Sequence, residues 1–133
     1  MLAVIDTNVW VSAFLSSKGA PARLLNAFVK GHLIPVYSEE IEAEYLDVLY
    51  RDKLNIDRVV LDEFIGLLIE YGQLVIPVKF DSANLPDPDD APFIAAALAA
   101  GCLIVTGNTK HFPATSGVEI LIPAEALARL QAA

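Results

Sequence analysis

The sequence predicts an α/β fold with three layers, in which helices cover both faces of a mostly parallel central sheet of about five strands. Three observations predict it. Short apolar runs such as Leu2 to Ile5 and Leu103 to Val105 have the composition of strands buried on both faces. Segments with helical start and stop signals separate them. The chain also lacks repeats, low-complexity tracts and linkers, so we expect one domain, residues 1–133.

The first part of the chain reads as strand, helix and strand, the opening of a βαβ unit. Leu2 to Ile5 is an unbroken apolar run and is the first strand. After a loop at Ser16 to Gly19, a helix is expected from about Pro21 to Lys30, because proline suits the first turn of a helix and Gly31 suits its end. Leu33 to Tyr37 is the second strand.

Two helices and a third strand are expected next. Ser38 is a good N-cap for a helix that runs to about Tyr50. Asp57 caps a second helix in the same way, and this helix ends near Gly72. Leu74 to Val78 is the third predicted strand.

The remaining elements follow a loop from Asp81 to Asp90 that contains two prolines. This loop leads to a helix at about Pro92 to Ala100, and the fourth strand is Leu103 to Thr106. Val118 to Ile122 is the fifth predicted strand, and the last helix is expected at Ala124 to Leu130.

The formal net charge of −8 argues against a broad basic surface of the kind that binds nucleic acid through phosphate contacts. It does not exclude a nuclease, because metal ions neutralise an acidic cleft locally and a partner or a second subunit can supply basic surface. The longest apolar stretch, Phe93 to Val105, is short for a bilayer and is interrupted by Gly101. The start of the chain lacks a basic leader, so a cytoplasmic protein is expected. Cys102, the single cysteine, is expected to be a small buried apolar residue.

Polar residues directly follow two of the predicted strands. Asp6 and Asn8 come after the first strand, and Thr106 and Asn108 come at the end of the fourth. Parallel sheets bind ligands outside the carboxyl ends of their strands, so these side chains are expected to converge. A carboxylate at a buried strand end is costly unless it is paired, hydrogen-bonded or bound to a cation, which predicts a metal site. The ordinary alternative is that these Asp and Asn side chains stabilise turns.

Three aspartates, Asp87, Asp89 and Asp90, precede the alanine-rich helix. One of them is expected to cap it, because Asp is favoured at the N-terminus of any helix. Three negative charges exceed what one helix terminus needs, and their mutual repulsion is best relieved by a cation. This surplus favours a metal site.

A further acid is expected from the helix that Ser38 caps. Glu44 lies beside the apolar face of this helix, and Glu42 also lies near an apolar edge, so periodicity does not choose between them. A solvated surface carboxylate is the ordinary alternative for either one. Lys110 and His111, which follow Asn108, are expected at the surface, although either could meet a phosphate.

In this order the segments resemble the PIN-domain ribonucleases, in particular the toxin components of bacterial and archaeal toxin–antitoxin pairs. The resemblance covers essentially the whole chain. Four motifs carry it, and they lie at Val4 to Val9, Ser38 to Tyr45, Asp87 to Ala97 and Ile104 to Asn108. Each motif is weak alone, but four in the correct order and strand context are specific.

The resemblance implies that Asp6, Glu44 and Asp90 are catalytic residues and ligands of Mg²⁺ or Mn²⁺, in a PIN-like three-layer fold. Within the acidic cluster it selects Asp90 over Asp89. Asn108 occupies the place where many relatives carry a fourth acid, and as a neutral ligand it leaves three carboxylates, enough for one hydrated cation.

The implied function is a metal-dependent endoribonuclease that hydrolyses RNA phosphodiester bonds and acts as the toxin of a toxin–antitoxin pair. Asn8 and Thr106 are expected to hydrogen-bond the metal ligands into place. The implied partners are an RNA substrate, a cognate antitoxin protein and a second copy of the chain, with no membrane.

The alternative function is a catalytically weak PIN-like module that binds RNA or an antitoxin without cleaving RNA. Asn108 and the acidic composition favour this alternative, and the three acids oppose it. A phosphatase with an aspartyl nucleophile is less attractive, because the sequence from Asp6 to Asn8 lacks a second acid two positions on.

Overall fold

The computed structural model of the chain describes residues 1–113 and 116–132. All pairings in its sheet are parallel, and the strand order is β3-β2-β1-β4-β5. The strands are β1 (Leu2–Ile5), β2 (Ile34–Tyr37), β3 (Gln73–Leu74), β4 (Leu103–Val105) and β5 (Ile120–Leu121). The α-helices are α1 (Thr7–Leu15), α2 (Ala20–Val29), α3 (Glu39–Leu49), α4 (Arg58–Tyr71), α5 (Ala91–Ala100) and α6 (Pro123–Ala132).

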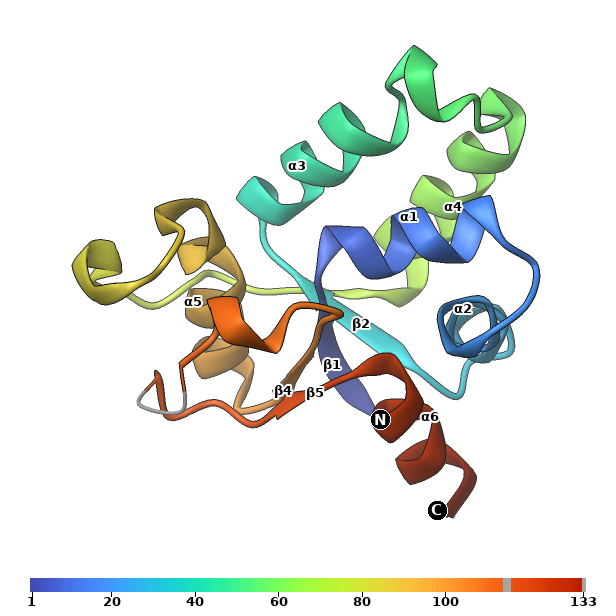
Figure 1. Cartoon of the computed structure of the whole chain (residues 1–133). Helices are drawn as coiled ribbons and strands as arrows, with labels where there is room; N and C mark the ends of the chain where they lie inside the picture. Colours follow the sequence, from blue (N-terminus) through green and yellow to red (C-terminus); the bar gives the residue numbers. More distant parts are fainter. Residues whose placement is uncertain (114–115, 133) are drawn as a thin grey trace.

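Helices cover both faces of the sheet, as the sequence predicts for a three-layer α/β/α fold. In Figure 1, α5 lies on one side of the strands, and α1, α2 and α4 lie on the other. Helix α3 rises beyond the end of β2 and contacts both α1 and α5, so it bridges the two layers at this edge. The predicted fold class is confirmed.

Helix α1 is the largest difference from the sequence prediction, which placed no helix between the first strand and the loop at Ser16. The chain passes from β1 into α1 at Asp6, whose backbone oxygen accepts a hydrogen bond from Val9 N at 2.9 Å. Val9, Trp10 and Ala13 are buried, and Val9 and Trp10 belong to the hydrophobic core. Several β-branched residues in this segment disguise the helix, but burial outweighs their weak helix propensity.

Strand β3 is also shorter than predicted, because it covers Gln73–Leu74 and includes only Leu74 of the expected strand Leu74 to Val78. Val75 N still donates to Tyr37 O at 2.8 Å, but the pairing stops there. Pro77 has no N–H to continue the ladder, and Ile76 is 90% exposed at the sheet edge. The apolar character of this segment therefore does not reflect burial in a strand.

An aromatic cluster fills the core between α1, α2 and α4. Trp10 is fully buried, and its ring centroid lies 4.9 Å from that of Phe64 and 6.0 Å from that of Phe28. The ring planes meet at oblique angles, an arrangement that aromatic quadrupoles favour. These contacts hold α1, the helix that directly follows Asp6, against its neighbours.

The central pair of strands brings two of the predicted polar segments together. Strand β1 pairs with β4 so that Ile5 lies opposite Val105, and Asp6 N donates to Val105 O at 2.9 Å. Asp6 and Thr106 therefore leave the sheet side by side at its carboxyl edge.

Within the described part of the chain, no helix is long and apolar enough to cross a membrane.

Candidate metal centre

Asp6 is a buried carboxylate at the end of β1, with 7% of its surface exposed. Its Oδ2 accepts a hydrogen bond of 2.7 Å from Thr106 Oγ1, and Thr106 is itself fully buried. Burial raises the pKa of Asp6, while the Thr106 hydroxyl and the backbone amides of Thr7 and Asn8 oppose this rise. The carboxylate is therefore fixed in position but poorly solvated, a state that a bound cation would stabilise.

Glu44 reaches the same region from α3. Its Oε2 accepts a hydrogen bond from Thr7 Oγ1, and burial raises the pKa of Glu44, with further increases from the charges of Asp6 and Asp89. The neighbouring Tyr45 is fully buried and its hydroxyl donates to Ile5 O, which ties α3 to the end of β1. The backbone geometry around β1 thus holds Glu44 near Asp6.

Of the two glutamates that the sequence left open, only Glu44 contacts the residues around Asp6. Glu42 lies near Tyr37, where burial and then the charge of Glu42 raise the tyrosine pKa. Thr7, which sequence reasoning missed, is the hydroxyl that links the start of α1 to Glu44. Its place directly after Asp6 at a strand end was the available signal.

The three aspartates of the acidic cluster have different surroundings and different hydrogen bonds. Asp87 Oδ1 accepts a hydrogen bond of 3.0 Å from Asp89 N and caps the 3₁₀ turn Pro88–Asp90. The expectation that one of the three aspartates caps the alanine-rich helix is wrong, because this cap serves the turn before the helix and α5 itself has no side-chain cap. Asp89 is exposed. Asp90 precedes α5, and its carboxylate makes no capping hydrogen bond to that helix.

Asp90 carries an unsatisfied oxygen. Its Oδ2 is buried and has no hydrogen-bond partner among the described residues. Burial, followed by the charges of Asp6 and Asp87, raises the pKa of Asp90 to about 6. Buried carboxylate oxygens are costly without a partner, and a divalent cation is the partner that suits several acids at once. The side chains present fit a metal ion for this reason.

Asn108 and His111 close the site from the β4 side. Asn108 N donates to Thr106 Oγ1 at 3.0 Å, and its side-chain Nδ2 lies 3.0 Å from His111 Nε2. The other ring nitrogen, His111 Nδ1, lies 3.1 Å from Asp90 Oδ2. The expected surface position of His111 is only partly correct, because 39% of its side chain is exposed while the ring lies between Asp90 and Asn108.

The remaining predicted residues stand apart from these contacts. Asn8 is exposed, and in the part of the chain that the structure describes its side chain makes no hydrogen bond, so Asn8 reaches Asp6 through its backbone amide. Lys110 is exposed, as expected.

Among the described residues, one group of three has ligand atoms within 4.8 Å of one another, and it consists of Asp87, Asp90 and His111. Asp6 and Glu44 interact with Asp90 through their charges without belonging to that group.

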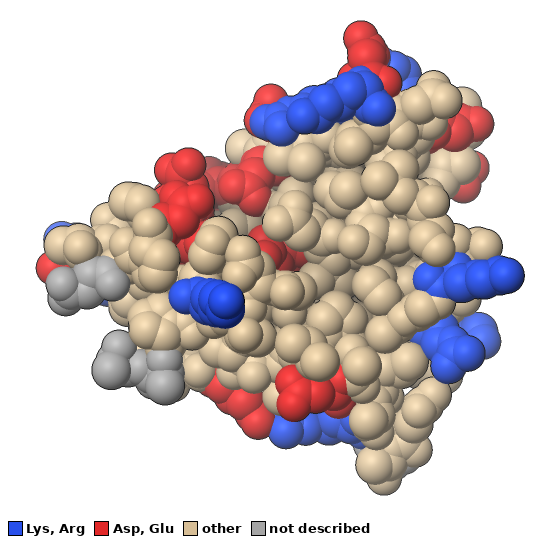
Figure 2. Space-filling view, viewed as in Figure 1, with Lys and Arg blue, Asp and Glu red and all other residues tan. Residues whose placement is uncertain are grey.

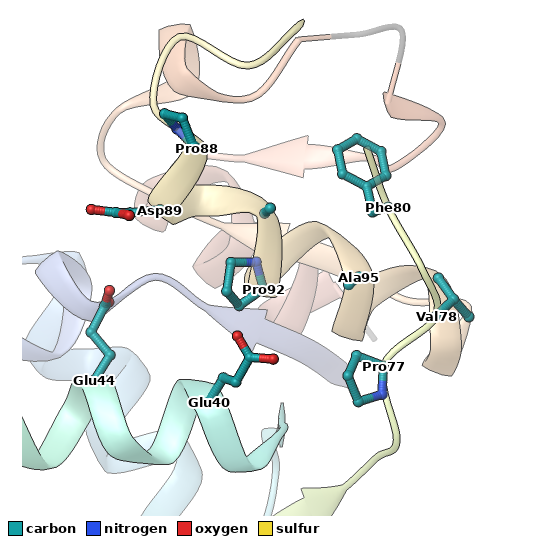
Figure 3. A pocket seen from close by; sticks show the side chains of 10 residues that line it. Glu40, Glu44, Pro77, Val78, Phe80, Pro88, Asp89, Pro92 and Ala95 are labelled. Carbon is teal, nitrogen blue, oxygen red and sulfur yellow. The ribbon is translucent and has the colours of Figure 1, made fainter. Parts of the chain in front are cut away.

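A groove of about 490 Å³ runs beside the acids between α3 and α5. Figure 3 shows Glu40 and Glu44 of α3 on one side of it and the turn with Asp89 on the other, while Phe80 and several prolines form an apolar wall. No Lys or Arg is among the residues that line it. In Figure 2, acidic side chains gather around the same hollow. An anionic ligand would enter this groove more readily with a cation bound.

The charges of the site give a pH dependence to stability. We expect the metal-free protein to become more stable as the pH falls from about 7 toward about 4, because Asp90 binds a proton more tightly in the folded chain than in the unfolded one. This contribution is fully present below the ordinary pKa of 3.8 and is lost as the pH rises through about 6. The measurement is the urea midpoint in EDTA across this range, for the wild type and Asp90→Asn. Parallel pH profiles of the two proteins would contradict the expectation.

A family model described as PIN domain matches residues 3–110 of the chain. No curated protein and no solved structure matches the chain.

Proposed function

Because the chain belongs to the PIN-domain family, whose members are generally metal-dependent nucleases, we propose that it is a metal-dependent endoribonuclease that hydrolyses phosphodiester bonds of RNA. The observation that carries this proposal is the buried Asp90 Oδ2, which accepts no hydrogen bond among the described residues and whose carboxyl pKa is raised by burial and by the charges of Asp6 and Glu44. Asp6 itself lies at the carboxyl end of the parallel strand β1. Oxygen ligands grouped in this way suit Mg²⁺ or Mn²⁺.

In the proposed site Asp6, Glu44 and Asp90 hold the cation. When bound, the cation lowers the pKa of a water and stabilises charge on the attacked phosphate. Thr106 fixes Asp6 and Thr7 fixes Glu44, so each carboxylate meets the cation in one orientation. No covalent nucleophile is required.

The role of the nuclease is proposed from the resemblance to toxin components. We propose that the chain is the toxin of a toxin–antitoxin pair, with RNA as substrate and an antitoxin protein as partner, acting in the cytoplasm as one domain of residues 1–133. Because the chain has a net charge of −8, RNA binding needs an additional source of positive charge. Either the bound cation or a partner surface supplies it.

The direct test is cleavage of mixed cellular RNA with Mg²⁺, with Mn²⁺ and with EDTA. Cleavage should appear with a divalent cation and stop with EDTA. Cleavage that continues in EDTA would remove the metal from the proposed mechanism.

Metal binding should also stabilise the fold. A ligand that binds only the native state adds about 2.7 kcal/mol at roughly a hundred times its Kd. We therefore expect saturating Mn²⁺ to raise the melting temperature of the wild type and to raise that of Asp90→Asn much less. An equal melting temperature of the wild type with and without saturating Mn²⁺ would count against an assembled metal site.

A second candidate function is the catalytically weak binding module, and the specific observation that favours it is the neutral Asn108 at the end of β4. Replacing Asn108 with Asp restores a negative group. We expect Asn108→Asp to tighten Mn²⁺ binding and to lower the Mn²⁺ concentration for half-maximal cleavage, because a carboxylate supplies charge that an amide lacks. Calorimetry and cleavage rates measure the two quantities. Unchanged or weaker Mn²⁺ binding would remove Asn108 from the site.

A further inference from the structure

The His111 ring lies close enough to the Asp90 carboxylate for both side chains to bind one cation. Its Nδ1 lies 3.1 Å from Asp90 Oδ2, yet this oxygen remains without a hydrogen bond, so the ring N–H is not directed at it. A separation of about 3 Å is the one expected for two neighbouring ligand atoms of a six-coordinate cation with bonds of about 2.1 Å. The 3.1 Å separation of these two atoms therefore matches that of two ligand atoms on one cation.

Asp87 completes the group. One ligand atom from each of Asp87, Asp90 and His111 lies within 4.8 Å of the others. One oxygen of Asp87 accepts the capping bond from Asp89 N, which holds its carboxylate in place. We propose that Asp87, Asp90 and His111 form a mixed oxygen and nitrogen site for a divalent cation that prefers Mn²⁺ to Mg²⁺. This inference rests on the metal dependence of the proposed function and shares Asp90 with the site of Asp6 and Glu44.

The preference follows from the nitrogen ligand. Mg²⁺ takes oxygen ligands and gives up its waters reluctantly, whereas imidazole is a suitable ligand for transition-metal ions. His111 replaces one oxygen with a neutral nitrogen. It also lies one residue past the matched segment 3–110, so the family match does not assign it.

Asn108 supports the ring in this arrangement. A ligand Nδ1 must offer its lone pair, so the ring proton is on Nε2, which lies 3.0 Å from the Asn108 side-chain amide. A half-turn of that amide lets its oxygen accept the proton. Histidines that bind metals usually donate their other N–H in this way. Asn108 thus acts on the cation through the ring.

The structure also explains how His111 reaches the site. The 3₁₀ turn Thr109–His111 folds the chain back after β4, and His111 N donates to Asn108 O at 3.2 Å. This short turn brings the ring to the carboxylate of Asp90, which lies directly before α5.

The experiment uses Mn²⁺ alone with the RNA-free protein. Electron spin echo spectra of the Mn²⁺-loaded wild type should show coupling to an imidazole nitrogen. The signal should vanish in His111→Gln and persist in His32→Gln, a matched control because His32 is the only other histidine and is exposed. A wild type without nitrogen coupling would overturn the site.

Calorimetry measures the preference. His111→Gln should bind Mn²⁺ at least about tenfold more weakly and change Mg²⁺ affinity by less than about twofold. Asp87→Asn retains an oxygen for the capping bond, so it should weaken Mn²⁺ binding without lowering the melting temperature of the metal-free protein. Equal losses for both ions in His111→Gln, or wild-type Mn²⁺ affinity in both variants, would overturn the proposal.

Two further variants separate this site from the nuclease proposal. Asp6→Asn should keep the nitrogen coupling, because Asp6 is outside the group of three, even though its cleavage is lost. A wild type that shows the coupling but cleaves no RNA would support the site and reject the nuclease. The effect of Asn108→Asp on Mn²⁺ binding should be smaller in the His111→Gln background than in the wild type, and an equal effect in both backgrounds would overturn the support that Asn108 gives through the ring.

Discussion

Asp6→Asn is expected to lower the rate of RNA cleavage by about a thousandfold or more, which corresponds to roughly 4 kcal/mol of transition-state stabilisation. The substitution removes a charged oxygen from the centre of the site while it nearly preserves size. The amide oxygen of Asn can still accept the hydrogen bond from Thr106 Oγ1, so the end of β1 should keep its structure. The loss would therefore report on charge at the cation.

Asp90→Asn should cause a similar loss, and the double variant should be little worse than either single one, because groups that act as one unit are not additive. Glu63→Gln is the matched control, since Glu63 is an exposed acid on α4 away from the site. Single-turnover cleavage rates at saturating Mn²⁺ measure all four variants. Wild-type rates in Asp6→Asn would end the proposal that this carboxylate holds the metal.

Trp10→Ala should have the largest effect on the fold itself. The side chain is fully buried against Phe28 and Phe64, and large-to-small changes of this kind cost about 3–5 kcal/mol. Urea unfolding followed by circular dichroism measures the loss. Trp10→Phe, which keeps an aromatic ring in the cluster, should lose much less. A cost below about 1 kcal/mol for Trp10→Ala would show that the core at α1 is not closed as described.

The sequence was sufficient where burial and strand order alone decide the outcome. Unbroken apolar runs predicted β1 and β4, and the rule that polar residues at parallel strand ends converge predicted that Asp6 and Thr106 would meet, as their hydrogen bond of 2.7 Å shows. The family resemblance is confirmed by the match over residues 3–110. The metal-binding roles of Asp6, Glu44 and Asp90 stay predictions.

The sequence was insufficient where tertiary contacts override local preference. Thr7 opens a helix whose β-branched residues suggested none, and only the packing of Trp10 on its neighbours reveals why it forms. His111 looks like a surface residue because its partner Asp90 is distant in sequence, with α5 and β4 between them. Val75 to Val78 looks like a strand because periodicity does not show that a segment lies at an edge.

The strand order also determines when the residues of the candidate site can come together as the chain is synthesised. β1 lies between β2 and β4, so the early part of the chain can pair β1 with β2 while β4 has not yet left the ribosome. Asp6 and Glu44 then stand at a sheet edge without Asp90, Thr106 or His111. The candidate metal site is therefore complete only when the last third of the chain, which carries Asp90, Thr106 and His111, has been synthesised.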